Sequence, residues 1–136
     1  LFEHPLVEYI GEIGEQDKSE FLGNAMALLF PIQWEEPFGL VMIESMACGT
    51  PVVAYPRGSV TEVIEHGVNG LIVSSVEEAV NAVRNISCVS RRECRRIFEK
   101  RFTAPIMARE YLQVYDRLLS GVDNESLTNP LSHEVY

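Results

Sequence analysis

Two glutamates, Glu36 and Glu44, are the residues whose type and spacing point most directly to chemistry. Seven residues separate them, and these include the sequence Pro-Phe-Gly. Glu44 stands in the run from Phe38 to Cys48, which is otherwise apolar apart from glycine and serine. Burying an unpaired carboxylate costs free energy, so a carboxylate in such a run indicates a partner or a ligand. Carboxylate oxygens accept hydrogen bonds, and the hydroxyls of a sugar or a ribose are suitable donors.

The same spacing has a plainer interpretation. Glu44 could lie on the exposed stripe of an amphipathic helix, where a charged side chain stays solvated. Glu36 could be an ordinary residue of a surface loop, because two glutamates at this separation are common. The spacing alone leaves both interpretations open.

Strands and helices that could position these residues alternate along the sequence. Short apolar runs at 26–32, 51–55 and 69–73 predict buried strands, and the alternating segment 6–13 predicts a further strand. Helices are expected at 17–25, 40–48, 59–67, 75–86, 90–102 and 105–120. Asp17 is the expected N-cap of the first helix, Glu20 completes its capping box, and Gly49 ends the second. This alternation predicts an α/β fold, a parallel sheet with helices on both faces.

The loops that follow the strands should carry the site, since ligands of such folds bind beyond the carboxyl ends of the strands. Loops 33–39 and 56–58 both follow predicted strands. A helix that begins near Gly39 would point its free N–H groups at this edge, and such groups favour an anion. With Glu36 and Glu44 on either side, the arrangement would fit a ligand with an anionic middle and hydroxyls at both ends. A nucleotide-sugar has that layout.

Composition places the chain among globular proteins. Its 136 residues are one domain's worth or a piece of a longer protein, and the lack of an initial methionine favours a piece. Hydrophobic residues make up 46% of it, which is enough for a core. No apolar run approaches the roughly 18–20 residues of a membrane span, and no secretory leader is evident. We therefore expect a cytoplasmic protein.

The charge pattern argues against one class of partner. A net charge of −9 makes nucleic acid an unsuitable ligand. Residues 1–90 contain three cations, Lys18, Arg57 and Arg84, whereas six of the eleven lie between Arg91 and Arg101. That basic run is interpreted as a solvated helix face, with a contact to acidic lipid or an acidic partner as the alternative. The three cysteines are expected to be free thiols, because their spacings are unrelated.

The stretch EEPFGLVMIESMACGTPVVAYPRGSVTEVIEHGVNGLIV resembles the donor-binding motifs of retaining glycosyltransferases of family 4, or group 1, which have the GT-B fold. Their E-x7-E motif matches Glu36 and Glu44, and their E-A-M-A-C-G-x-P-V-V-A segment matches ESMACGTPVVAY. Their G-G-x-x-E-x-x-x-x-G-x-x-G-x-L-V pattern corresponds to RGSVTEVIEHGVNGLIV, and MAREYLQVYDRLL is similar to their closing helices. The resemblance covers roughly residues 5–120.

The resemblance implies a role for each matching residue. Glu36 would face the transferred sugar and stabilise charge near its anomeric centre, which makes it the catalytic residue. Glu44 would bind the ribose hydroxyls, Ile13 would pack on the nucleobase, and Gly58 would let its loop approach the sugar. Pro37 would fix the entry to the helix, and backbone amides of Phe38, Gly39, Leu40 and Val41 would contact the sugar and the pyrophosphate.

The reaction implied by the resemblance is the transfer of a sugar, of hexosyl type, from a nucleoside diphosphate sugar to an acceptor. The anomeric configuration would be retained. No metal ion or other cofactor is expected to be essential, since the helix N-terminus and cations take its place. The implied ligand is the nucleotide-sugar donor, whereas the sugar, the base and the acceptor stay unspecified.

The chain also departs from the family pattern. These enzymes have an N-terminal Rossmann-like domain and, early in the donor domain, an Arg and a Lys that clamp the phosphates; the sequence shows neither. We therefore expect a partial Rossmann-like donor domain over 1–120, a mobile tail over 121–136, and no activity from this piece alone. An exposed sheet edge is expected to favour self-association. Association of a longer protein with a membrane surface stays open.

Two other functions compete with this expectation. A non-catalytic module for nucleotide-sugar binding or assembly would keep the fold without the chemistry, but the intact Glu36, Glu44 and Gly39 count against it. Another GT-B enzyme, such as a sugar-nucleotide epimerase or a phosphorylase, lacks the combination of EPFGLVMIE with ACGTPVVA. An assay of transfer against epimerisation separates these enzymes.

Overall fold

The computed structural model describes residues 3–120 of the chain. The contacts divide the chain into two compact units, Leu1–Glu99 and Lys100–Tyr136. The first unit contains the sheet and the predicted site, and the second contains the last helix. The tail predicted for 121–136 lies outside the described residues.

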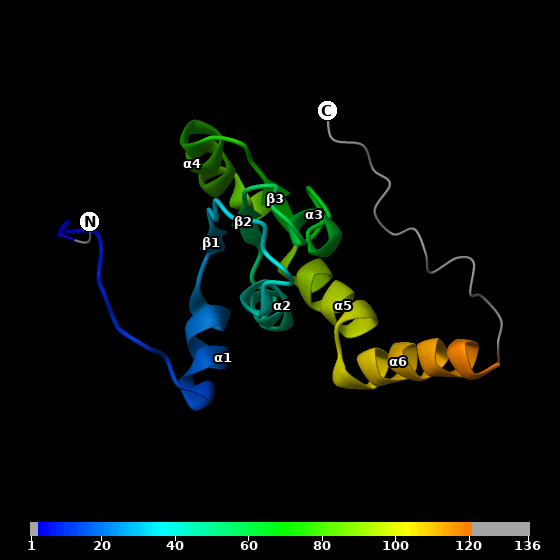
Figure 1. Cartoon of the computed structure of the whole chain (residues 1–136). Coiled ribbons are helices and arrows are strands. Elements are labelled where there is room, and N and C mark those ends of the chain that lie inside the picture. Colours follow the sequence, from blue (N-terminus) through cyan, green and yellow to red (C-terminus); the bar gives the residue numbers. More distant parts are fainter. Residues whose placement is uncertain (1–2, 121–136) are drawn as a thin grey trace. The chain divides into compact units, whose positions relative to one another are not determined.

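The sheet of the first unit has three parallel strands. They are β1 (Leu28–Phe30), β2 (Val52–Ala54) and β3 (Gly70–Ile72), and they lie in the order β1-β2-β3 (Figure 1). The register pairs Leu29 with Val53 and Val53 with Leu71. The central strand β2 is buried along its whole length, which explains its unbroken Val-Val-Ala sequence. Each of these strands lies within one of the predicted apolar runs but is shorter than the run.

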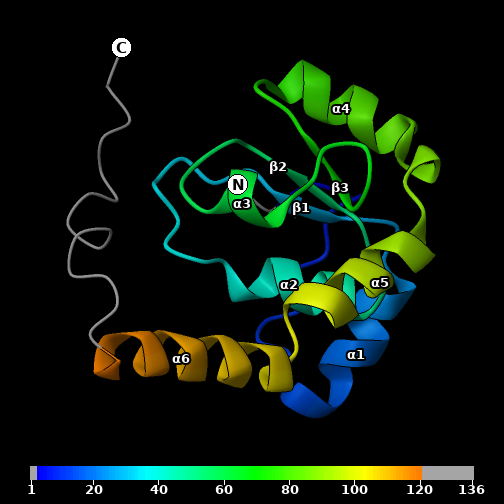
Figure 2. The ribbon, with the colours of Figure 1, turned by 90° about the vertical axis from the view of Figure 1, so that its right-hand side faces the viewer.

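Helices precede, connect and follow the three strands. Within the described residues they are α1 (Glu15–Asn24), α2 (Leu40–Ala47), α3 (Val60–Val63), α4 (Val76–Arg84), the 3-10 turn η1 (Ile86–Cys88), α5 (Arg91–Arg101) and α6 (Ala104–Leu119). Figure 2 shows α4 on one face of the sheet, with α2 and the neighbouring α1 on the other. The predicted α/β arrangement is therefore confirmed.

Apolar side chains on both faces of β2 form the core of the first unit. Met42 and Met46 of α2 are fully buried on one side. On the other side, Val53 and Val73 pack with side chains of α4. Glu44 lies between the two methionines in the sequence, and a residue two positions along a helix points to the opposite face. The packing of α2 thus turns Glu44 away from the core.

The strand predicted for 6–13 is wrong. These residues form no ladder, and the side chains of Leu6 and Tyr9 are 88% and 77% exposed. Figure 1 shows the segment as an extended trace that leads to the start of α1 and lies apart from the sheet. The apolar and polar residues of this segment alternate as they do in a strand. A strand is stable, however, only where a neighbouring strand supplies hydrogen-bond partners. Within the described residues, β1 pairs with β2 alone, so its outer edge is open.

Helix α1 begins earlier than predicted. Its N-cap is Gly14, whose extended backbone precedes the first helical residue, Glu15. Asp17 lies inside the helix and donates its own N–H to the carbonyl of Gly14 at 3.1 Å. The capping box predicted from Asp17 and Glu20 is therefore wrong. The C-terminal signal of α2 is confirmed, because Gly49 follows that helix with a φ of 72° in the left-handed region.

Helix α3 ends at Val63, although the pattern predicted a helix from 59 to 67. The buried side chain of Asn69 accounts for the difference. Its Oδ1 accepts a hydrogen bond from the N–H of Glu65 at 2.8 Å, and its Nδ2 donates to the carbonyl of Val63 at 3.1 Å. A side chain that takes up these backbone groups competes with the helix for them.

The basic run in α5 has a structural use. The guanidinium of Arg91 donates to the carbonyls of Gly23 and Ala25, at 2.6 and 2.7 Å, where α1 ends. Arg95 donates to the carbonyl of Ala47 at 2.5 Å, where α2 ends. Cations at helix C-termini satisfy free carbonyls and oppose the helix dipole. The run is thus more than a solvated face, and its contact with an acidic surface stays a prediction.

The three cysteines are free thiols, as predicted. Cys48 is half-buried, Cys88 is exposed and Cys94 is fully buried. The Sγ of Cys94 donates to the carbonyl of Asn69 at 3.5 Å, and burial raises the pKa of this thiol to about 11. A neutral, enclosed thiol packs as a small hydrophobic side chain and is a poor nucleophile.

The second unit contains α6, which has a proline in its first turn. Its apolar residues Tyr111, Leu112 and Tyr115 are exposed in the structure. The rings of Tyr111 and Tyr115 lie 6.5 Å apart between centroids. Within the part of the chain that is described, no helix combines the length and the apolar character needed to cross a membrane.

Candidate functional site

The three strands end at the same edge of the sheet because they are parallel. Figure 2 shows α2 and α4 beginning on that side, where the loops after the strands turn back. A hollow of about 700 Å³ lies there, lined by Ile32, Gln33, Tyr55, Pro56, Arg57, Ser74, Ser75 and Val76. Ligands of parallel α/β folds bind at such an edge. The structure therefore offers room for a ligand beside the predicted loops 33–39 and 56–58.

The N-terminus of α2 lies at this edge and begins on a glycine. Gly39 is the N-cap, with φ 72° and ψ 64°, and no side chain caps the helix. A Cβ at this position would lie 2.5 Å from Cε of Met42 and 3.3 Å from Cγ of Glu36. Glycine is thus favoured by the left-handed backbone and by the close approach of the Met42 side chain, with Glu36 as a tight second neighbour. The N–H of Met42 donates to the carbonyl of Gly39 at 2.9 Å. No acidic residue stands in the first turn, so the N–H groups of Leu40 and Val41 are the ones that can face an anion.

Glu36 is half-buried and held on both its side chain and its backbone. The indole N–H of Trp34 donates to its Oε2 at 3.1 Å. Its backbone carbonyl accepts a hydrogen bond from the N–H of Ser59 at 2.9 Å. Trp34 therefore orients the carboxylate of Glu36. The second carboxylate oxygen, Oε1, is left for a ligand.

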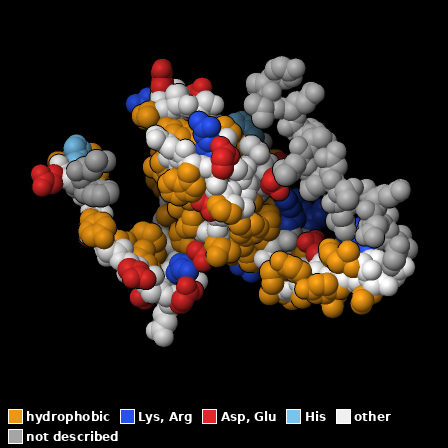
Figure 3. Space-filling view, in the orientation of Figure 1, with side chains coloured by type: hydrophobic (Ala, Val, Ile, Leu, Met, Phe, Trp, Pro, Cys, Tyr) orange, Lys and Arg blue, Asp and Glu red, His pale blue; other side chains and the backbone are white. Residues whose placement is uncertain are grey.

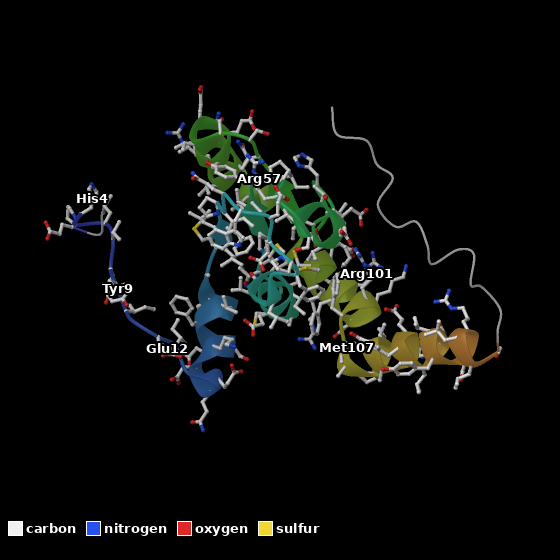
Figure 4. The ribbon with its side chains drawn as sticks, in the orientation of Figure 1. His4, Tyr9, Glu12, Arg57, Arg101 and Met107 are labelled. Carbon is white, nitrogen blue, oxygen red and sulfur yellow. The ribbon has the colours of Figure 1, made fainter. Side chains whose placement is uncertain are left out.

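Gly58 brings the loop after β2 directly against Glu36. Its φ is 54°, and a Cβ would lie 2.3 Å from the carbonyl oxygen and 2.5 Å from the nitrogen of Glu36. The N–H of Gly58 donates to Oε2 of Glu35 at 2.6 Å, and a guanidinium nitrogen of Arg57 lies 3.8 Å from that carboxylate. Figure 4 labels Arg57 in this loop. Any larger residue at Gly58 would push the loop away from Glu36.

Glu44 is joined to α1 by an ion pair. Nζ of Lys18 lies 2.9 Å from Oε1 of Glu44 and 2.5 Å from Oε1 of Glu15. The hydrogen bond with Glu15 has the largest effect on the pKa of Lys18, and the hydrogen bond with Glu44 the next largest. Together they raise this pKa to about 12. The side chain of Glu44 is 35% exposed, so it is neither the buried carboxylate nor the freely solvated one that the sequence allowed. The other oxygen, Oε2, remains for a ligand.

The predicted site residues are brought together in part. Glu36, Gly39 and Gly58 meet at the start of α2, and Glu44 stands one turn into the same helix. Pro37, Phe38, Leu40 and Val41 accompany Gly39 along the entry to α2. Ile13 lies just before α1, in the segment that forms no strand, and Figure 4 shows Tyr9 and Glu12 of that segment away from the sheet. The packing of Ile13 on a nucleobase stays a prediction.

Sequence reasoning missed two partners in this site. Lys18 was counted as one of few cations, but neither Lys18 nor Trp34 was assigned to a glutamate. The contact of Lys18 with Glu44 spans 26 positions of the chain, which no local pattern encodes. Among residues 3–120, no group of three or more His, Cys, Asp and Glu side chains is placed to hold a metal ion.

Known structures share this arrangement of sheet and helices. Sucrose-phosphate synthase from Thermosynechococcus elongatus superposes with a TM-score of 0.72 at 27% identity, over 85% of this chain and 31% of that chain. Anabaena Alr3699/HepE in complex with UDP-glucose superposes with a TM-score of 0.68 at 26% identity, over 84% of this chain and 32% of that one. The fold is that of the GT-B glycosyltransferases.

The family model for glycosyl transferases group 1 matches residues 4–101. The chain therefore belongs to the group 1 glycosyltransferase family, and the resemblance noted in the motifs is confirmed. A probable sucrose-phosphate synthase from Thermosipho melanesiensis is 36% identical over 86 residues, which are 60% of this chain and 20% of that protein. The chain spans less than a third of the length of each of these relatives.

Proposed function

We propose that this chain is the donor-binding part of a retaining glycosyltransferase of hexosyl type. It works in the cytoplasm, where nucleoside diphosphate sugars are made. The proposal does not specify the acceptor of the sugar. The observation that carries the proposal is the meeting of Glu36, Gly39 and Gly58 at the N-terminus of α2. Family membership supports glycosyl transfer as the reaction. The similar Anabaena protein in complex with UDP-glucose makes this compound the first donor to test.

In this proposal each group of the site receives one part of the donor. The open N–H groups of the first turn of α2 receive the diphosphate. Oε1 of Glu36, left unused by Trp34, accepts from a hydroxyl of the transferred sugar and faces the positive charge that develops at its anomeric carbon. Oε2 of Glu44, left unused by Lys18, accepts from the ribose hydroxyls.

This chain alone should bind its donor weakly and transfer no sugar. A helix N-terminus contributes roughly 0.3–1 kcal/mol toward an anion at an exposed site. A millimolar dissociation constant already requires about 4 kcal/mol, and a micromolar one about 8 kcal/mol. Arg57, the cation of the loop after β2, is directed to Glu35. The helix N-terminus takes the place of a metal ion in this proposal, but it does not replace a clamp of cations on the phosphates.

The test is an NMR titration of the 15N-labelled chain with UDP, GDP, ADP and their common sugar conjugates at millimolar concentrations. The expected result is a set of shifts confined to the amides of Gly39 to Glu44 and of Gly58, with one base preferred. Shifts at Ile13 would add the nucleobase contact. If saturating ligand leaves the amides of α2 unmoved while shifts appear elsewhere, the assignment of the site is wrong.

A specific observation also favours assembly, the second function considered. The open edge of β1 lies beside an apolar hollow of about 530 Å³ between the sheet and α4, lined by Leu29, Pro31, Val53, Tyr55, Val73, Val76, Ala79, Val80, Val83 and Arg84. Leu29 is 57% exposed although it lies in a strand. Figure 3 shows hydrophobic side chains gathered over this part of the unit. An open edge beside an apolar surface is a template for strand pairing.

We therefore expect the chain to self-associate through the β1 edge. Sedimentation equilibrium over a range of chain concentrations should show a dimer whose fraction rises with concentration. Replacing Leu29 with lysine places a charge on that edge and should shift the equilibrium to monomer. The matched control is Leu112→Lys in the second unit, where the side chain is also exposed. Equal effects of the two variants would contradict pairing at β1.

A further inference from the structure

The ion pair of Lys18 with Glu44 joins α1 to α2 at the edge where both helices begin. Helix α1 begins at Glu15 and α2 at Leu40, so both charged side chains lie within the first two turns of their helices. The side chain of Lys18 is 26% exposed, and its ammonium lies between two carboxylates. An ammonium carries three N–H donors, of which Glu15 and Glu44 take two.

The charges around this pair favour a cation there. Residues 1–90 contain Lys18, Arg57 and Arg84 as their cations. Arg57 faces Glu35 in the loop after β2, and Arg84 lies at the end of α4 beside the apolar hollow. Of these three, Lys18 is the one whose charged group contacts a predicted ligand-binding side chain. A chain of net charge −9 must otherwise bind an anionic ligand against its own field.

We propose that Lys18 is the positioning residue of the donor site, which holds the carboxylate of Glu44 and cancels its charge so that a nucleoside diphosphate can bind beside it. The inference rests on the proposed function. Glu44 offers one oxygen to Lys18 and keeps the other for ribose hydroxyls. Without Lys18 the same carboxylate is a free negative charge close to the diphosphate, and like charges at short range repel.

The competing explanation is that the ion pair only holds α1 against α2 and has no effect on the charge of the site. Exposed ion pairs often contribute little free energy. The two roles differ in their dependence on the charge of the ligand. If the ion pair only holds the helices together, its loss displaces α1 from α2 and lowers the affinity of every ligand of the site equally. Charge cancellation affects UDP strongly and uridine, which carries no phosphate, only slightly. The comparison of these two ligands therefore separates the roles.

The experiment measures binding of UDP and of uridine to the chain by NMR titration, for the wild type and for Lys18→Met. Methionine keeps the length and the helix propensity of lysine and removes its charge. We expect Lys18→Met to weaken UDP binding about fivefold or more and uridine binding less than about twofold. Lys18→Arg should restore most of the loss. The control is Lys100→Met, which removes the other lysine of the chain and should change neither ligand.

A second substitution gives the sharper test. In the wild type, Glu44→Gln should weaken UDP binding, because it removes a charged acceptor from the ribose. In the Lys18→Met background, the same substitution should strengthen UDP binding, because it removes the uncompensated charge. This change of sign is the expected result, and a cycle of this kind isolates the coupling of the two residues.

Three outcomes have distinct meanings. If Lys18→Met binds UDP as the wild type does, or loses UDP and uridine equally, the positioning role is wrong while the donor site stands. If the sign of Glu44→Gln is the same in both backgrounds, charge cancellation is wrong. If the wild type binds neither UDP nor uridine at α2, the proposed function and this inference are both overturned.

Discussion

Replacing Glu44 with alanine is expected to weaken UDP binding by about tenfold or more and to leave the chain folded. A hydrogen bond to a charged group contributes roughly 1.5–3 kcal/mol, which corresponds to about 10–100-fold in affinity. The side chain of Glu44 is not part of the core, since Met42, Ser45 and Met46 are the buried residues of α2. Alanine also has the highest helix propensity, so α2 loses nothing from its own backbone preference.

The measurement pairs the NMR titration with urea unfolding monitored by circular dichroism. Glu110→Ala is the matched control, because Glu110 is an exposed glutamate within α6, a helix of the second unit. The control should bind UDP as the wild type does. If Glu44→Ala instead unfolds the first unit, the carboxylate is a structural group and the site assignment fails. Unchanged affinity in a folded variant would leave the exposed-stripe interpretation of Glu44 as the better one.

The sequence could predict the elements that rest on local signals. Apolar runs marked β1, β2 and β3, and glycine after Cys48 marked the end of α2 with its left-handed backbone. These signals worked because a central parallel strand must be apolar on both faces, and a helix end needs a residue that tolerates positive φ. The order of elements then placed the loops after the strands, and with them Glu36 and Gly58, at one edge.

Failures arose where the outcome depended on a contact that the pattern of apolar and polar residues does not encode. The segment 6–13 has the alternation of a strand, but no adjacent edge pairs with it in the described structure. Helix α3 stops early because Asn69 takes up backbone groups of Val63 and Glu65. In the first case the lack of a pairing edge decided the result. In the second, side chain to backbone hydrogen bonds across four and six positions did so.

In the candidate site too, some features follow from local sequence signals and others from contacts between elements. The motif fixed the identities of Glu36, Gly39 and Glu44, but their partners come from elsewhere in the chain. Lys18 reaches Glu44 from α1, and the loop of Gly58 reaches Glu36 from the end of β2. Gly58 was expected to let its loop approach a sugar, whereas the structure shows it packed against the backbone of Glu36. Such contacts follow from the packing of elements, which a single sequence does not encode locally.

Replacing Gly70 with valine is expected to lower the free energy of unfolding by about 3 kcal/mol or more. A Cβ at Gly70 would lie 2.4 Å from the carbonyl oxygen of Val52 and 2.9 Å from Cγ2 of Ile64. Val52 is the ladder partner of Gly70, so the oxygen belongs to backbone that cannot move without opening the sheet. Valine has a higher strand propensity than glycine. Propensity therefore predicts stabilisation, and the close approach of the strands predicts the opposite.

Urea unfolding of the variant decides between these two predictions. The matched control is Gly23→Ala in α1, where a Cβ meets nothing within 4 Å and the backbone is helical. Alanine there should stabilise the chain by about 0.5–1 kcal/mol, because glycine carries an entropic penalty in helices. A domain typically has only about 5–15 kcal/mol of stability, so a loss of the expected size at Gly70 moves the midpoint far toward lower urea. A Gly70→Val chain that unfolds with the wild-type midpoint would show that β2 and β3 lie farther apart than the structure places them.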